Sequence, residues 1–106
     1  VALRYDPKKD FAPMVVARGR GETALAIRSL AAENNVPILE YPQLARAIYF
    51  TARAGQTIAE DLYVAVATIL AFVFNIDRAM AEGISPPLVE VPSEKHFDEN
   101  GVRHAT

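Results

Sequence analysis

The sequence predicts one small α/β domain in which helices surround a small mixed β-sheet. Two observations carry this prediction: short apolar segments near the N-terminus alternate with the period of strands, and longer segments later in the chain have the period of helices. The chain has 106 residues, of which 51% are hydrophobic. A chain of this size buries about two thirds of its unfolded surface, which suffices for one core. The order of the segments is typical of helices packed around a sheet.

Strands are expected over residues 1–5, 14–17 and 36–40. In the first, Val1, Leu3 and Tyr5 alternate with less apolar neighbours, as in a half-buried strand. Pro37 cannot donate a hydrogen bond to a ladder, so the third strand is expected at an edge or to start there. Three strands make a small sheet, and the first begins at residue 1. A partner strand is therefore expected from polypeptide before it.

The first two helices are expected over about residues 22–34 and 42–52. The first has a stripe of four apolar residues, Ala24, Ile27, Leu30 and Ala31. Asn34 and Asn35 suit a left-handed stop after it. Pro42 suits the first position of the second helix, where its missing N–H would have no partner.

A third, long C-terminal helix is expected from residue 57 to about residue 81. Thr57 and Glu60 have the spacing of a capping box ahead of an apolar run, and Gly83 suits a C-terminal stop. The apolar stripe of this helix comprises Leu62, Val66, Ile69, Leu70, Val73 and Phe74. A helix this apolar is either central to the core or presents one face to a partner.

Composition excludes several classes of protein. The formal net charge is −2, so wholesale nucleic-acid binding is not expected. The chain contains no cysteine, which excludes a disulfide framework, a thiolate zinc site and a cysteine nucleophile. The longest nearly apolar run, residues 62–74, is shorter than the roughly 20 residues of a membrane-spanning helix. No signal peptide is visible, and the chain opens with Val1 instead of Met, so we expect a piece of a longer protein.

Charge divides the chain unevenly. Residues 1–58 carry eight basic and five acidic side chains, whereas residues 59–106 carry three basic and eight acidic ones. Much of the acidic excess follows Gly83, in a stretch that also holds three prolines. We therefore expect a domain over residues 1–83 and an extended acidic tail over residues 84–106.

Few residues suggest chemistry of their own. Glu60 and Asp61 are adjacent on a helix, so their side chains point in different directions and do not form an acid–base pair. Their negative charges are expected to stabilise the N-terminal end of the helix through its macrodipole. His96 and His104 lie in the polar tail without clustered ligands, so we expect solvated histidines and no metal site. The sequence Gly-Arg-Gly at residues 19–21 resembles the start of a phosphate-binding turn, but it lacks a third glycine and precedes an acidic residue. No cofactor is expected.

Five separated strings match one known family in order and spacing. They are Val-Ala-Leu-Arg-Tyr at 1–5, Ala-Pro-Met-Val-Val-Ala-Arg-Gly at 12–19, Val-Pro-Ile-Leu-Glu at 36–40, Leu-Ala-Arg-Ala-Ile-Tyr at 44–49 and Leu-Tyr-Val-Ala-Val-Ala at 62–67. Together they resemble the cytoplasmic domain of the FlhB/YscU/SpaS family of type III secretion switch proteins. The resemblance covers about residues 1–80, and the second string favours the flagellar branch. Ala59 departs from the family, which often has Pro there.

The resemblance implies a function in protein export. Such proteins are held in the bacterial inner membrane by a separate N-terminal half, and this domain projects into the cytoplasm. They cleave themselves once at an Asn-Pro-Thr-His loop, which would lie just upstream of Val1. The chain is then the inert fragment after cleavage, not an enzyme, and the preceding strand is the fourth of the sheet. Cleavage permits a switch from rod and hook substrates to filament substrates.

The resemblance also implies partners and a docking pocket. The partners are the N-terminal transmembrane part with its upstream strand, another export-gate protein, the hook-length control protein and rod or hook substrates. The pocket residues that it implies are Ala12, Pro13, Ala67 and Leu70. A competing interpretation makes Ala67 and Leu70 ordinary core residues. Two other functions stay open: a phosphate- or nucleotide-binding domain built on residues 19–21, and a purely structural docking domain.

Overall fold

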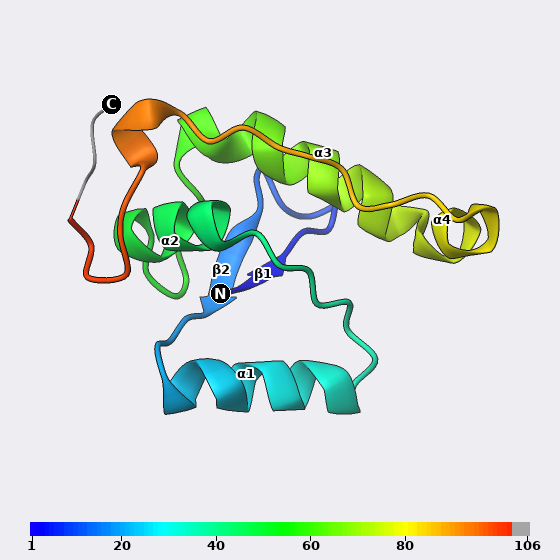
Figure 1. Ribbon diagram of the computed structural model, residues 1–106, viewed down its shortest axis with the longest axis horizontal. Coiled ribbons are helices and arrows are strands. Elements are labelled where there is room, and N and C mark those ends of the chain that lie inside the picture. The colour runs from blue at the N-terminus through cyan, green and yellow to red at the C-terminus, as the bar shows by residue number, and fades with distance from the viewer. Residues whose placement is uncertain (103–106) are drawn as a thin grey trace.

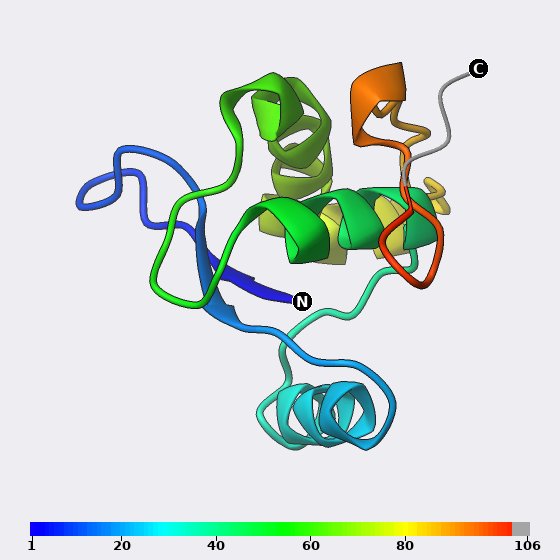
Figure 2. The ribbon, with the colours of Figure 1, turned by 90° about the vertical axis from the view of Figure 1, so that its left-hand side faces the viewer.

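The computed structural model describes residues 1–102, and it confirms an α/β domain (Figure 1). Its elements are β1 (Ala2–Arg4), β2 (Met14–Ala17), α1 (Glu22–Glu33), α2 (Pro42–Thr51), the 3-10 turn η1 (Glu60–Leu62), α3 (Tyr63–Phe74), α4 (Ile76–Glu82) and the 3-10 turn η2 (Ser93–Lys95). The two strands lie in the middle of the molecule, with α1 on one side and both α2 and α3 on the other (Figures 1 and 2). The expected long C-terminal helix is absent from the described residues.

The sheet has two strands, not the three expected. β1 pairs with β2 in antiparallel fashion, with Leu3 opposite Val15 and Arg4 opposite Met14. Residues 36–40, expected as the third strand, run as irregular chain and join no strand within the described part of the molecule. Within residues 1–102, the outer edge of β1 therefore has no strand beside it.

A loop segment, residues 55–58, takes the place beside β2 that a third strand would occupy. The N–H of Val15 donates to the carbonyl of Gln56 at 2.8 Å, and the carbonyl of Val15 accepts from the N–H of Gly55 at 2.7 Å. The N–H of Ile58 donates to the carbonyl of Pro13 at 3.0 Å. These bonds satisfy the N–H and the carbonyl of Val15, the fully buried residue of β2.

The first two helices have nearly the expected bounds, but only α2 contributes to the core. Asn35 has the expected left-handed φ of 58°, after the last residue of α1. No residue of α1 is buried, and Leu30 on its apolar stripe is 62% exposed, so this helix lies outside the core. Pro42 starts α2 as expected, and α2 buries Leu44, Ala47 and Ile48.

The expected long helix is broken at Asn75. The helical segment Glu60–Phe74 and α4 meet there at 73°. The side chain of Asn75 explains the break, because its Nδ2 donates to the carbonyl of Ala71 at 3.0 Å and so takes an acceptor of the helix end. Gly83 ends α4 in the left-handed conformation, as expected. No single helix in the described chain meets the length and hydropathy of a membrane span, whereas the two bent segments meet them only when taken together.

The expected capping box is also wrong. Thr57 forms an isolated antiparallel bridge with Met14, and the helical turns begin at Glu60. Neither η1 nor α3 has a side-chain cap hydrogen bond. The bridge with β2 holds residue 57 in extended conformation, so its hydroxyl is not placed at the helix start. Glu60 and Asp61 still lie in the first turn, where acidic side chains favour the helix dipole.

The core lies between β2, α2 and the first turns of α3. Its largest fully buried side chains are Val15, Ile48, Leu62 and Val66. Val15 belongs to β2, Ile48 to α2, Leu62 to η1 and Val66 to α3. The core therefore joins the strand to both helices. Residues 84–102, hereafter the strap, run back across this unit from α4 (Figure 1). Val89 and Val91 of the strap pack against the core.

Specific contacts hold the strap in place. The hydroxyl of Tyr41 donates to the carbonyl of Pro87. Lys95 Nζ lies 2.9 Å from Asp61 Oδ2, and the ring centroids of Phe50 and Phe97 are 5.4 Å apart. The stretch expected as an extended tail is therefore packed on the domain as far as the structure describes it.

Candidate functional site

A hollow of about 320 Å³ lies between the loop of the β1–β2 hairpin and α3, and we call it the hairpin hollow. Its walls come from both segments: Tyr5, Phe11, Ala12, Pro13, Tyr63, Ala67, Leu70, Ala71 and Phe74. The structure thus brings all four residues of the expected docking pocket into one concave surface.

The four expected residues differ in burial. Ala12 and Pro13 are buried and form the wall on the hairpin side. On α3, Leu70 is half-buried and packs partly against the core. Ala67 is exposed, so it is not an ordinary core residue. A small side chain at this position leaves the floor of the hollow open.

Four aromatic residues also line the hollow, and no sequence pattern singled them out for this site. Phe11 is 92% exposed and Phe74 is 57% exposed, although both are large and apolar. Tyr5 and Tyr63, which also line the hollow, are half-buried. The spacing of residues 63, 67, 70 and 74 places them on one helix face and could have indicated this surface. Exposed apolar clusters of this kind are typical of binding sites.

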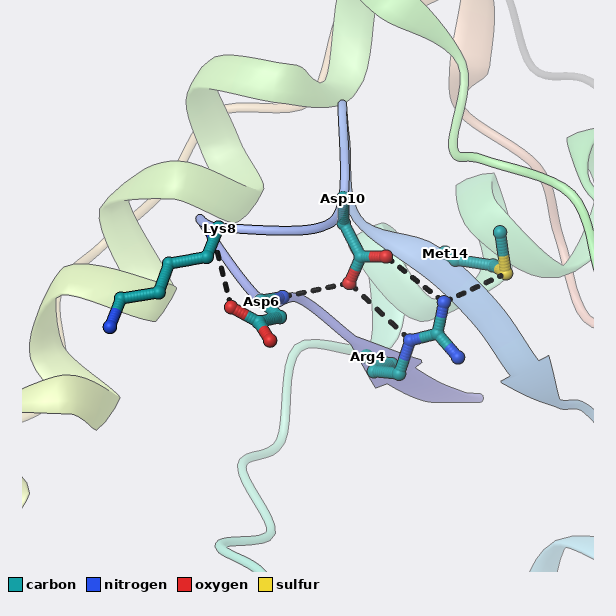
Figure 3. Close-up of polar contacts among 5 residues, drawn as sticks. All are labelled: Arg4, Asp6, Lys8, Asp10 and Met14. Carbon is teal, nitrogen blue, oxygen red and sulfur yellow. Dashed lines mark hydrogen bonds and ion pairs between the residues drawn. The ribbon is translucent and has the colours of Figure 1, made fainter.

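A polar network holds the hairpin loop in shape (Figure 3). Asp10 accepts hydrogen bonds from Arg4 Nη2 at 3.0 Å, from Arg4 Nε at 3.3 Å and from the N–H of Asp6 at 2.8 Å. The hydrogen bonds from Arg4 and from the Asp6 backbone hold the pKa of Asp10 below its ordinary value. The carbonyl of Asp6 in turn accepts from the N–H of Asp10 at 2.7 Å. The network therefore fixes the turn that leads directly into Phe11 and Pro13.

The Gly-Arg-Gly turn at residues 19–21 is used for internal contacts. Arg20 Nη2 donates to the carbonyl of Glu99 in the strap at 2.9 Å. The N–H groups of Thr23 and Leu25 donate to the carbonyls of Arg20 and Gly21. These N–H groups and this nitrogen of Arg20 are therefore not free to bind a phosphate. The turn instead connects α1 to the strap.

Two of the remaining polar candidates, Asp61 and His96, have structural partners, and a third lies outside the described residues. Asp61 pairs with Lys95, and His96 Nε2 lies 2.6 Å from the carbonyl of Val91. His96 is half-buried, which differs from the solvated side chain expected. His104 lies outside the described residues. Within residues 1–102, no group of three or more potential metal ligands comes together.

The profile of the FlhB HrpN YscU SpaS family matches residues 1–73, more than half of the chain. The chain belongs to this family. It is similar to flagellar biosynthetic protein FlhB of Escherichia coli K12, with 48% identity over 92% of the chain. It is also similar to the FlhB of Salmonella typhimurium LT2, with 52% identity over 85% of the chain. The matches span only 26% and 24% of those FlhB proteins.

A solved structure of the FlhB family has the same fold. The crystal structure of the cytoplasmic domain of FlhB from Shewanella putrefaciens matches with a TM-score of 0.78 and 38% identity. The match covers 91% of this chain and 78% of that one. It therefore extends beyond the residues of the family profile.

Proposed function

We propose that this domain is the cytoplasmic part of a flagellar FlhB-type protein and binds apolar segments of early export substrates in the hairpin hollow. The observation that carries the proposal is the meeting of Ala12 and Pro13 with Ala67 and Leu70 in one exposed, apolar hollow. Membership of the FlhB family supports a role in the flagellar export apparatus. The expected substrates are rod and hook subunits.

The hollow suits a weak and reversible contact. A volume of about 320 Å³ accommodates a few aliphatic or aromatic side chains of a peptide. Complete burial of one such side chain contributes roughly 1.5–3 kcal/mol. Pro13 has a fixed φ, and the network around Asp10 holds the preceding loop, so little conformational entropy is lost on binding. Rapid release is what repeated passage of substrates requires.

The switching role is part of the same proposal. The parent protein is expected to be anchored in the inner membrane and to cleave itself once in a loop before β1, whereas this domain has no catalytic role. Cleavage would free the start of β1 and allow the hook-length control protein to change the substrates that the domain accepts. β1 is the edge strand of the hairpin whose loop carries Pro13, which supports a connection between cleavage and the hollow.

The substitution Ala67→Asp tests the docking proposal. A carboxylate on the floor of the hollow would have to lose water when an apolar side chain binds, so binding of a rod-subunit peptide should be abolished. Ala81→Asp is the matched control, because Ala81 is exposed on α4 and lies outside the hairpin hollow. Affinity is measured by NMR titration of the isotope-labelled chain, and circular dichroism shows that each variant is folded.

The titration has a clear contrary result. If folded Ala67→Asp binds the peptide as well as the wild type and Ala81→Asp do, the hairpin hollow is not the docking site. Ala67 and Leu70 would then have only a structural role.

A further inference from the structure

A second hollow lies at the bend between α3 and α4, and it continues from the first. We call it the elbow hollow; it has a volume of about 400 Å³ and is lined by residues that include Asn75, Arg78, Glu82 and Ile84. Ala71 lines both hollows. The two therefore adjoin each other at Ala71 on α3.

The bend at Asn75 creates the elbow hollow. A straight helix would carry residues 76–82 onward along the axis of α3, but the 73° turn swings α4 aside. Gly83 then reverses the chain, and the N–H of Ile84 donates to the carbonyl of Ala79 at 2.8 Å, which closes the far wall. A backbone hydrogen bond thus holds the turn that forms this wall.

The chemistry of the elbow hollow differs from that of the hairpin hollow. Arg78 is on its wall, with its side chain 77% exposed. Glu82 lies on the same wall and forms an ion pair with Arg78, through Nε at 3.2 Å, so this wall carries both charges. No side chain of the described residues bonds the two terminal nitrogens of Arg78, and these carry the paired donors that suit a carboxylate. The elbow therefore offers the two terminal guanidinium nitrogens of a paired arginine next to the apolar hairpin hollow.

We propose that the elbow hollow is a second subsite for the docked export segment, in which Arg78 binds an acidic side chain that flanks the apolar anchor. The inference rests on the docking role proposed above. The small side chain of Ala71 allows a peptide to pass from one hollow to the other without interruption. The favoured ligand is thus an apolar segment with an Asp or Glu beyond one end.

Synthetic peptides of two lengths separate the subsites. The short probe is a rod-subunit peptide trimmed to its apolar anchor residues, and the extended probes add Gly-Ser-Glu-Gly at one end or the other. One extended probe should bind about threefold more tightly than the short one, as expected for an exposed ion pair. It should also shift the amide NMR signals of Arg78 and Ala79, whereas the short probe should shift mainly those of Ala67 and Leu70.

Charge reversal supplies the specific control. Arg78→Glu should remove the gain from the extension without changing the affinity of the short probe, and replacing Glu by Lys in the probe should restore the gain. Arg53→Glu makes the same change of charge at an exposed residue outside both hollows, and it should leave the gain intact.

The results distinguish this inference from the docking proposal. If the short probe binds but neither extension adds affinity or shifts Arg78, the elbow subsite is refuted and the hairpin hollow stands. If the short probe does not bind the wild type, the docking proposal fails and the elbow subsite fails with it.

Discussion

Replacing Arg18 by Ala should destabilise the domain, because this side chain joins the end of β2 to the end of α2. Arg18 Nη1 donates to the carbonyl of Tyr49 at 2.6 Å and to that of Ala52 at 3.1 Å. These carbonyls belong to the C-terminal end of α2, where acceptors lack helical partners. The guanidinium carbon also lies 4.1 Å from the centre of the Tyr49 ring.

The expected loss follows from these three contacts. A hydrogen bond to a charged group contributes about 1.5–3 kcal/mol, and a cation–π contact contributes about 0.5–1 kcal/mol at an exposed site. Arg18 is only half-buried, so water replaces part of what is lost. We therefore expect Arg18→Ala to lower the free energy of unfolding by about 2–3 kcal/mol. For a domain of this size, each kcal/mol lowers the melting temperature by roughly 4 °C, so the fall should be about 8–12 °C.

Thermal and urea unfolding followed by circular dichroism measure this effect. Arg18→Lys should be intermediate, because an ammonium group cannot reproduce the planar stacking on Tyr49. Arg53→Ala is the control, since Arg53 is exposed and should change stability by less than about 0.5 kcal/mol. A melting temperature of Arg18→Ala within about 2 °C of the wild type would show that these contacts add no net stability and that the reasoning is wrong.

Three further predictions concern the hairpin and its neighbours. The pKa of Asp10 is lowered in the folded chain from an ordinary 3.8, so its stabilising pair with Arg4 is present at neutral pH and is lost as the pH falls below that value. Urea unfolding at neutral and at acid pH should therefore show that the free energy of unfolding falls less on acidification in Asp10→Asn than in the wild type. An equal fall in both proteins would contradict this. Thr57→Ala should change the free energy of unfolding by less than about 0.5 kcal/mol, because the hydroxyl caps no helix. A loss near 1 kcal/mol would show that Thr57 does cap the helix. A peptide with the residues that precede Val1 in the parent protein should pair with the outer edge of β1 and raise the melting temperature, whereas an unchanged value would argue against an upstream strand in the sheet.

The sequence predicted those features that depend on neighbouring residues. Alternation predicted the first strand of the hairpin, Pro42 predicted the start of α2, and Asn35 adopts the left-handed conformation expected after α1. The strings shared with the FlhB family predicted the family and also named four residues that the fold brings together. Such signals are visible locally because each depends on one residue's backbone preference or on a short repeat.

Only the tertiary structure decided how these elements meet. The neighbour of β2 is the loop at residues 55–58 and not residues 36–40, because a strand pattern does not specify which distant segment supplies its hydrogen bonds. The helix breaks at Asn75 although apolar residues continue beyond it, because the amide of Asn75 competes for the carbonyl of Ala71. The exposed ring of Phe11 belongs to the hairpin hollow only because α3 packs opposite the loop. Contacts between distant segments depend on packing and geometry that local sequence periodicity does not contain.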